Sequence, residues 1–280
     1  MAPVDLSLGS NNTKAAAVRL QLYNAGAGGI SARYRLLSRL EDWAECREYD
    51  HHRWDWNGRP VESTGALAAQ DGTPQGFVQI SAGLSVKDKR PTAPLRLTPR
   101  VIERFTGLLL SEDRHPQITV EGDEDADDFL QAVVAESNFW EAAANVRKSG
   151  GALGSVLFSF RVTEGRFTFK SHSARTVHEV LWRDRDAGIP SGVLIQYPVE
   201  RLVEEVDEKN GRRTGRLAPR TFLYRRIIDE EWDLVFKEVR LDSGRIPDME
   251  IDRAQSVKHD LGFFPGVWIK NLPGTDDSID

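Results

Sequence analysis

The chain of 280 residues contains a single cysteine, Cys46, and no long apolar run. One cysteine excludes a disulfide framework within the chain, and it excludes a zinc site built from several cysteines. No apolar run approaches the roughly 18 residues that a membrane-spanning helix requires. The first residues also lack the charged and then apolar pattern of a signal peptide. We therefore expect synthesis and retention in a cytoplasm, with no contact to a membrane.

Sequence signatures of catalysis are missing as well. No Gly-x-Ser-x-Gly nucleophile elbow occurs, and none of the six histidines has a partner motif. Carboxylates are so frequent that any chosen pair has no predictive value. Gly26, Gly28 and Gly29 are not followed by the Gly-Lys-Ser/Thr of a phosphate-binding loop, so we predict a flexible hinge there. These absences favour a protein with no enzymatic activity and no cofactor.

The chain also lacks a surplus of basic residues. Its 37 lysines and arginines face 43 aspartates and glutamates, which gives a net charge of −6. Proteins that bind DNA tightly usually carry excess positive charge, because release of counterions from phosphates drives that affinity. The balance argues against a tight DNA-binding protein, but it leaves room for a protein that surrounds DNA without adhering to it.

The first half of the chain has mainly helical patterns. Short or amphipathic helices are predicted at residues 15–23 and 31–48. In a third helix at 98–110, Thr98 is the expected cap, and a buried apolar stripe is formed by Val101, Ile102, Phe105, Leu108 and Leu109. A short strand at 117–120 precedes an acidic run, 121–128, which we interpret as the first turn of a helix at 126–136.

Residues 138–170 predict a helix that leads into a β-hairpin. Asn138 and Glu141 have the spacing of a reciprocal helix cap, and Gly150 is the expected helix end. Apolar residues then alternate over 155–162, and a turn at 163–165 returns the chain into a second strand. We expect Trp140 to be buried at the junction of the helix and the hairpin.

The remainder of the chain is rich in strand patterns. Strands are predicted at 177–182, 192–197, 201–206, 221–228 and 232–239, with Asn210-Gly211 at a hairpin tip and Pro198 at a sheet edge. The predicted fold class is therefore α+β, with N-terminal helices packed on a mostly antiparallel β-rich region. We expect residues 1–97 to form a helical segment with a long loop or arm, and residues 98–280 to form an α+β domain.

Two further readings come from residues 50–94. The sequence Asp50-His51-His52 raises the possibility of a metal-dependent hydrolase, although no further ligands follow at a suitable spacing. Trp54 and Trp56 precede a loop at 57–94 that is too long for an ordinary connection. Because aromatic residues are enriched in interface cores, this region could instead belong to a non-enzymatic protein-binding adaptor. We expect no metal site.

The order of several segments resembles the N-terminal half of tailed-bacteriophage portal proteins. The resemblance covers most of residues 98–273, and it rests on the order of motifs that are individually loose. These motifs are the helix at 100–105, the segment from Asn138-Phe139-Trp140 to Gly150, Gly151 and Gly154, the strand 180–184 (VLWRD), the hairpin 224–232 that begins YRRII, and the segment 262–273 (GFFPGVWIKNLP).

The resemblance implies a structural subunit of a ring, usually a dodecamer, at a vertex of the virion capsid, assembled in the host cytoplasm. Its partners would be copies of itself, the major capsid protein, the terminase, a head-completion protein, and double-stranded DNA that passes through without sequence-specific binding. We place the subunit interface at Trp54, Trp56, Arg225 and Arg226. Portals of this kind continue into a stem, clip and crown, so no residue here is assigned to DNA contact or motor docking.

Overall fold

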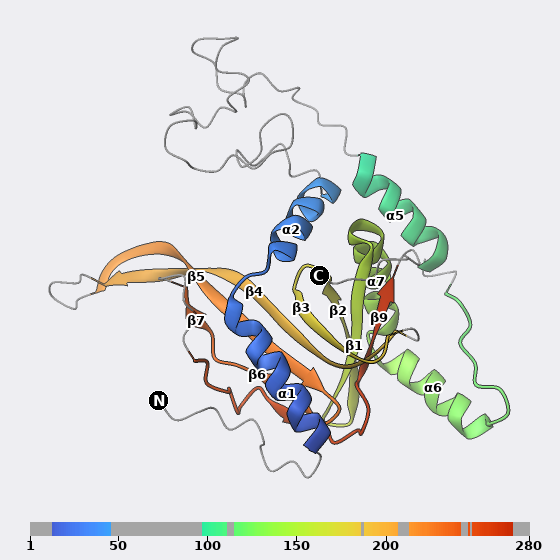
Figure 1. The fold of residues 1–280 in the computed structure, drawn as a ribbon. Helices are drawn as coiled ribbons and strands as arrows, with labels where there is room; N and C mark the ends of the chain where they lie inside the picture. Colours follow the sequence, from blue (N-terminus) through green and yellow to red (C-terminus); the bar gives the residue numbers. More distant parts are fainter. Residues whose placement is uncertain are drawn as a thin grey trace.

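The computed structural model of the protein describes residues 13–45, 97–110, 115–185, 188–206, 213–241, 246 and 248–270. These residues form helices packed around two antiparallel sheets, so the predicted α+β class is confirmed (Figure 1). The helical elements are α1 (Thr13–Ala25), the 3₁₀ turn η1 (Gly26–Gly28), α2 (Ala32–Ala44), α5 (Leu97–Leu110), α6 (Glu124–Glu136) and α7 (Phe139–Leu153).

The two sheets differ in size, and side chains from both contribute to one hydrophobic core. The smaller sheet has the order β2-β1-β9, and the larger has the order β3-β4-β5-β6-β8, with β7 also paired to β5. Their bounds are β1 (Ser155–Thr163), β2 (Arg166–Ser173), β3 (Val177–Asp184), β4 (Ile189–Val206), β5 (Arg213–Asp229), β6 (Trp232–Val235), β7 (Val239–Arg240), β8 (Val257–Lys258) and β9 (Gly266–Lys270).

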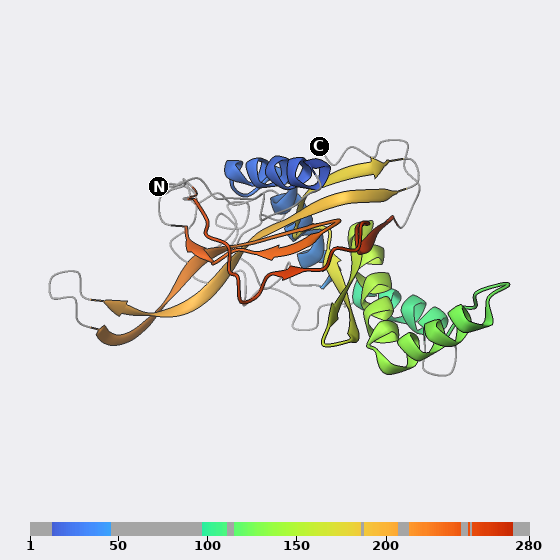
Figure 2. The ribbon, with the colours of Figure 1, turned by 90° about the horizontal axis from the view of Figure 1, so that it is seen from below.

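Both faces of the larger sheet are covered along its central part. Val193 and Ile195 of β4 point into a core shared with Leu157 of β1 and Trp268 of β9. Leu194 points the other way, into a second core beneath α1. Figure 2 shows α1 lying on one side of this sheet. Burial on both faces explains why residues 193–195 of this strand are all apolar, since successive side chains point to opposite faces.

The N-terminal helix belongs to the same packed body as the sheets. Leu22 of α1 is fully buried in the second core, and Leu37 of α2 is buried in the first. Gly192 of β4 lies directly beneath α1, because a Cβ there would come within 2.8 Å of Val18 and 3.0 Å of Leu22. Helices α1 and α2 therefore pack against strands from residues 98–280.

The glycine segment after α1 is packed rather than a loose hinge. Gly26 is buried, and its carbonyl oxygen accepts hydrogen bonds from Arg225 Nη2 at 2.8 Å and from Gln196 Nε2 at 3.0 Å. A Cβ at Gly26 would approach Gln196 Oε1 to 2.7 Å, so the close contact requires glycine. Our prediction of a flexible hinge at this place is corrected by these contacts.

Helix α7 begins where predicted, but its two ends are built differently. The Asn138 side chain does not cap the helix. Instead its Nδ2 donates to the Phe169 carbonyl at 2.9 Å, and its Oδ1 accepts from the Phe169 amide at 2.8 Å. Gly150 lies inside the helix, and the left-handed residue that ends it is Gly154, with φ 83°. Gly150 is buried because the helix passes close to Val156 there.

The predicted β1–β2 hairpin is confirmed and is longer than expected. Thr163 pairs with Arg166 across a two-residue turn whose residues, Glu164 and Gly165, both have positive φ, 53° and 75°. This geometry matches the twist of the strands that it joins. On the face toward α7, Phe139 packs edge-on against Phe158 and Phe169 in an aromatic cluster.

Two other local predictions change, and one is confirmed. Residues 192–197 and 201–206 form one continuous strand, β4, which contains Pro198. Pro198 pairs with Leu223 of β5, while the pairing with β3 ends at Ile195, so among the described residues the other side of Pro198 is an edge, as predicted. The predicted strand at 117–120 is irregular, and side chains of α6 bind its backbone instead.

Among the helices that the structure describes, none has the length and apolarity needed to cross a lipid bilayer.

Candidate subunit interface

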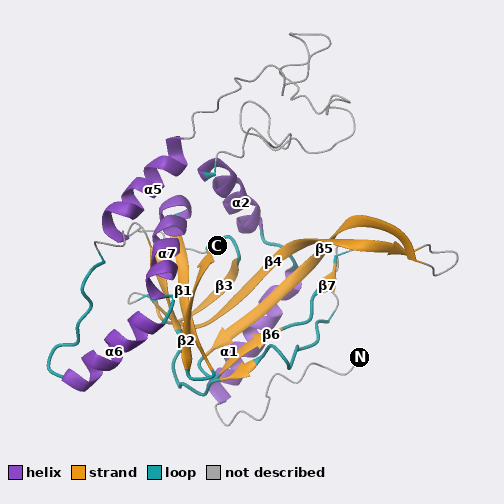
Figure 3. Ribbon diagram, turned by 180° about the vertical axis from the view of Figure 1, so that it is seen from behind, coloured by secondary structure: helices purple, strands orange, loops and turns teal. Residues whose placement is uncertain are grey.

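Helix α5 carries an apolar face that the rest of the described chain leaves uncovered. The predicted helix is present, but the predicted burial of its stripe is wrong. The side of α5 next to α7 is held by a contact of Ile102 with Gly151 and by an exposed ion pair of Lys148 with Glu103 at 3.5 Å. The remaining apolar residues are each more than half exposed: Val101, Phe105, Leu108 and Leu109. Figure 3 shows α5 at the outer side of α7.

Helix α6 extends this exposed region. It has no buried residue, and Phe129 is strongly exposed although its ring meets Phe167 edge-on at 6.1 Å. Asp123 caps the helix by accepting from the Ala126 amide at 3.0 Å, and the acidic first turn is confirmed. Residues 121–136 contain acidic residues and no basic ones. The helical end of the molecule is therefore partly apolar and strongly acidic.

A second exposed apolar surface lies on the arm formed by β4 and β5 beyond the other strands. In the register of the two strands, Leu202 pairs with Pro219 and Glu204 pairs with Leu217. Alternation along a strand therefore places Leu202, Pro219 and Leu217 on the same face of the arm. Leu202 is 67% exposed and Leu217 is 63% exposed. We call these three residues the arm patch.

The arm patch and the helical surface lie at opposite ends of the molecule. Figures 1 and 2 both place the β4–β5 arm at one end and helices α5 and α6 at the other. The charge patterns also differ: on the arm, residues 213–220 of β5 contain arginines and no acidic residue while residues 200–206 of β4 contain both signs, whereas residues 121–136 at the helical end contain acidic charges only. Two unlike surfaces on opposite ends are the arrangement needed for head-to-tail contacts between identical subunits, whereas a two-fold dimer uses one surface twice.

The two arginines predicted at the interface are inside the subunit. Arg225 is 2% exposed, and its Nε donates to Gln196 Oε1 at 2.6 Å while its guanidinium covers the Tyr23 ring. Arg226 is 6% exposed and forms two hydrogen bonds of 2.7 Å with Asp233. Both side chains hold the subunit's own core together, so they offer no surface to a neighbour. Trp54 and Trp56 lie outside the described residues.

Several other sequence predictions also fall outside the described residues. They are Cys46, the Asp50-His51-His52 sequence, the long loop at 57–94, the hairpin tip at Asn210-Gly211, and the end of the 262–273 segment. The two hairpin strands that flank the tip are confirmed as β4 and β5. Within the part of the chain that the structure describes, no cluster of three or more His, Cys, Asp or Glu side chains could hold a metal ion.

A buried ion-pair cluster fixes α1 to the larger sheet. Arg19 is fully buried, and its Nε donates to Asp229 Oδ2 at 2.5 Å while its Nη2 pairs with Glu231. Asp229 Oδ1 also accepts from the backbone amides of Glu231 and Trp232 at 2.7 and 2.8 Å. Burial raises the pKa of Asp229, although these hydrogen bonds and Arg19 oppose the shift. This cluster is internal, and it joins α1 to the larger sheet.

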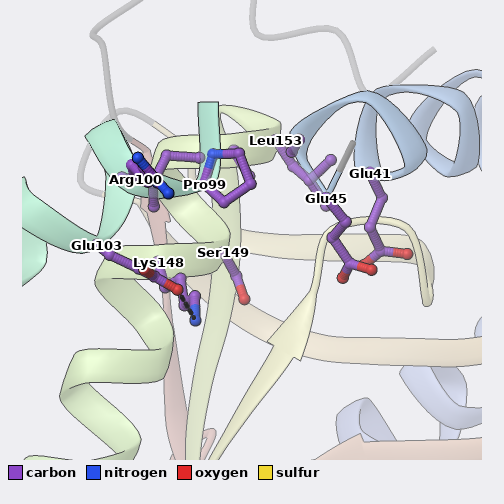
Figure 4. Close-up of a pocket in the computed structure, with 11 residues that line it drawn as sticks. Glu41, Glu45, Pro99, Arg100, Glu103, Lys148, Ser149 and Leu153 are labelled. Carbon is purple, nitrogen blue, oxygen red and sulfur yellow. Dashed lines mark hydrogen bonds and ion pairs between the residues drawn. The ribbon is translucent and has the colours of Figure 1, made fainter. Parts of the chain in front are cut away.

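A cavity of about 470 Å³ lies between α2, α5 and α7. Figure 4 shows Glu41 and Glu45 on one side of it, with Lys148 and Glu103 joined by an ion pair on the other. Glu41 also pairs with Arg175 at 2.9 Å. The lining combines acidic and basic groups, and it includes neither a histidine nor a cysteine. Its polar side chains are carboxylates, a lysine, an arginine and the hydroxyl of Ser149.

The nearest approach to a catalytic pair is Ser159 Oγ, which lies 3.0 Å from His172 Nε2. Burial, followed by the charge of Arg226, lowers the pKa of His172 to about 3, so its imidazole is a weak base. Ser159 is buried, and in the described residues no carboxylate bonds to His172 to complete a triad. The contact is best explained as a satisfied polar pair between neighbouring strands.

Comparison with known proteins adds no family to this picture, since no protein-family model matches the chain and no curated protein matches it significantly. The fold defines a class, an α+β body with two antiparallel sheets. The exposed surfaces define the candidate site, which comprises the apolar faces of α5 and α6 at one end and the arm patch at the other.

Proposed function

We propose that the protein is a structural subunit that assembles head-to-tail with copies of itself into a closed ring. One observation carries the proposal: unlike apolar surfaces occupy opposite ends of the folded body and have no partner within its described part. Monomeric proteins seldom expose contiguous large apolar side chains in this way, and such patches commonly mark contact sites. Heterologous contacts that close generate rings.

We further propose that the ring is the portal of a tailed bacteriophage. This narrower proposal is supported by the order of sequence motifs described above and by their place in the fold. The segment around Phe264 and Trp268, which in portals of this kind ends the β-rich region, here enters the core and forms β9 against β1. The proposed partners are the major capsid protein, the terminase, a head-completion protein and DNA in transit.

The acidic balance of the chain is compatible with that role. DNA that moves through a channel must not be held by many phosphate contacts, because each such contact adds affinity through counterion release. A net charge of −6 keeps the non-specific attraction of DNA to the surface weak. The proposal thus requires no catalytic group in this chain, and its chemistry is that of packing between subunits.

The protein-binding adaptor remains the second candidate, and it makes a different prediction. An adaptor would use one of the exposed surfaces for a different protein, and it would stay monomeric alone. The metal-dependent hydrolase requires ligands around Asp50, His51 and His52, which lie outside the described residues. Metal analysis of the purified protein tests that alternative directly, because a stoichiometric ion would support it.

Assembly can be tested with two variants that each damage one surface. Phe105→Asp places a charge on the α5 face, and Leu202→Asp places one on the arm patch. We expect mass photometry and negative-stain images to show rings for the unmodified protein and monomers for each variant. Leu20→Asp, which changes an exposed leucine on α1 away from both surfaces, is the matched control.

Mixing the two variants tests the head-to-tail geometry itself. Each variant retains the surface that the other has lost, so one productive contact can form between them. The mixture should therefore give heterodimers that grow no further. Monomers of the unmodified protein at about 10 µM, a concentration well above the dissociation constants of stable assemblies, would overturn the ring proposal. Equal disruption by L20D would show that the chosen surfaces are not special.

A further inference from the structure

A polar cavity separate from the proposed interface lies where the two sheets meet. It has a volume of about 240 Å³ and is lined by Lys170 and His172 of β2, Tyr197 of β4, and Tyr224 and Arg226 of β5. No carboxylate is among the residues that line it. This composition differs from that of the cavity beside α5, where acidic and basic groups are mixed.

Positive charge around this cavity exceeds negative charge. Lys170, Arg226 and Arg161 lie close enough to influence one another, and Asp233 is the carboxylate that acts on them. Asp233 uses both oxygens on Arg226 at 2.7 Å, and Arg161 approaches it to 3.6 Å. Lys170 forms no ion pair within the described part of the chain. Burial and the nearby Arg226 lower the pKa of Lys170, and Asp233, whose oxygens are bonded to Arg226, opposes the shift.

Two tyrosines line the same cavity. The rings of Tyr197 and Tyr224 lie 5.0 Å apart, and burial raises the pKa of both hydroxyl groups. Both tyrosines are therefore protonated at neutral pH and can donate. His172 is neutral there, because burial lowers its pKa to about 3, and it adds no charge to the balance. The nearby carboxylates Asp233 and Glu238 do not line the cavity, and they are paired with Arg226 and Arg201. Cations and hydroxyl groups that line a cavity form an environment suited to an oxyanion.

We propose that this cavity binds a small oxyanion of the phosphate type, with Lys170 as its charged ligand and Tyr197 and Tyr224 as hydrogen-bond donors. The anion would balance the surplus positive charge between the two sheets. The volume admits an inorganic phosphate or the phosphoryl group of a small monoester. Both sources share the chemistry that the cavity recognises, and the experiment below separates them.

The test is a calorimetric titration of the purified protein with inorganic phosphate and, separately, with glycerol phosphate, each at constant ionic strength set with chloride. We expect saturable binding of one molecule per chain. Tighter binding of inorganic phosphate would identify a free ion as the natural ligand, and tighter binding of glycerol phosphate would identify a phosphoryl ester. Saturable binding of neither would overturn the proposal.

Variants locate the site. Lys170→Met should weaken phosphate binding by about tenfold or more, since a charge-assisted hydrogen bond is worth at least that factor. Tyr224→Phe should weaken it less. Lys237→Met removes an exposed lysine elsewhere and should leave binding unchanged. Equal binding by K170M and the unmodified protein would refute the assignment. The titration also works on the monomeric variant L202D, so the result does not depend on ring formation.

Discussion

Removal of the buried guanidinium of Arg19 should destabilise the fold severely. In Arg19→Met the apolar volume of the side chain is largely kept, but Asp229 stays buried without its cation. Breaking one partner of a buried pair costs about 3–5 kcal/mol. This is a large fraction of the roughly 5–15 kcal/mol by which a protein is stable. The loss should be seen as a lower midpoint in equilibrium urea unfolding, followed by tryptophan fluorescence.

The pH dependence of the same variant provides a second test. Burial already raises the pKa of Asp229, and loss of Arg19 should raise it further. A carboxyl group with a raised pKa in the folded state binds more protons folded than unfolded, so stability increases as pH falls through that pKa. R19M should therefore regain part of its lost stability, relative to the unmodified protein, as the pH falls from neutrality toward the ordinary range of a carboxyl group.

A double-mutant cycle separates the ion pair from general damage to the core. R19M, Asp229→Asn and the combined variant should be non-additive by about 1–3 kcal/mol, because each single change leaves the other group unpaired. Arg253→Met alters an exposed arginine and should change the unfolding free energy by no more than about 0.5 kcal/mol. A loss below about 1 kcal/mol for R19M, or simple additivity in the cycle, would refute the reasoning.

Three further predictions use the same unfolding measurement. Gly192→Ala should lower the free energy of unfolding by about 1–3 kcal/mol, because its methyl group would meet α1. The control Gly107→Ala has open space around it on α5 and should be neutral or stabilising by up to about 1 kcal/mol. An unchanged stability of G192A would contradict the packing of α1. Because the pKa of His172 is lowered to about 3, the unfolded chain binds a proton there that the folded chain does not. The unmodified protein should lose about 1.4 kcal/mol per pH unit relative to His172→Gln as pH falls from about 6 to 4, and parallel pH profiles would contradict this. Trp140→Ala should cost about 1–3 kcal/mol, since the indole is half-buried and stacks on His115 at 4.3 Å; a loss above about 4 kcal/mol would indicate full burial.

The sequence predicted helix starts and hairpin turns well where a few neighbouring residues determine the backbone conformation. The acidic run at 121–128 begins a helix because Asp123 can cap it and the helix dipole favours negative charge there. The hairpin turn forms at Glu164-Gly165, where both residues have positive φ, and Gly165 supplies one of these positions without strain. Each of these signals depends on neighbours in the sequence and needs no information from the rest of the fold.

Predictions that depended on distant partners were less successful. Asn138 has the residue type of a helix cap, but its side chain instead forms hydrogen bonds with the backbone of Phe169, 31 residues away. Arg225 and Arg226 look like surface residues in the sequence, and their burial depends on Gly26 and Asp233 arriving from other elements. No local pattern contains that information.

The exposed surfaces were missed for a different reason. An apolar stripe on a helix has the same pattern whether it covers the subunit's own core or a neighbour, so α5 was predicted to be buried. On the arm, Leu202 was predicted as an ordinary strand residue, and Leu217 lay outside every predicted strand, although both lie on strands beyond the part of the sheet that other elements cover. The spacing of apolar residues indicates which face of an element is apolar. Only the tertiary structure shows whether other parts of the chain cover that face.

The side chain of Asn138 has a consequence for how copies of this protein can meet. Strand β2 lies at the border of its sheet, where free backbone groups invite a strand from another molecule. The carboxamide of Asn138 occupies both the amide and the carbonyl of Phe169 and thus imitates an additional strand for one residue. At Phe169, this edge therefore offers no free backbone donor or acceptor to a strand of another molecule. In the ring that we propose, contacts between copies would then rest on side-chain surfaces.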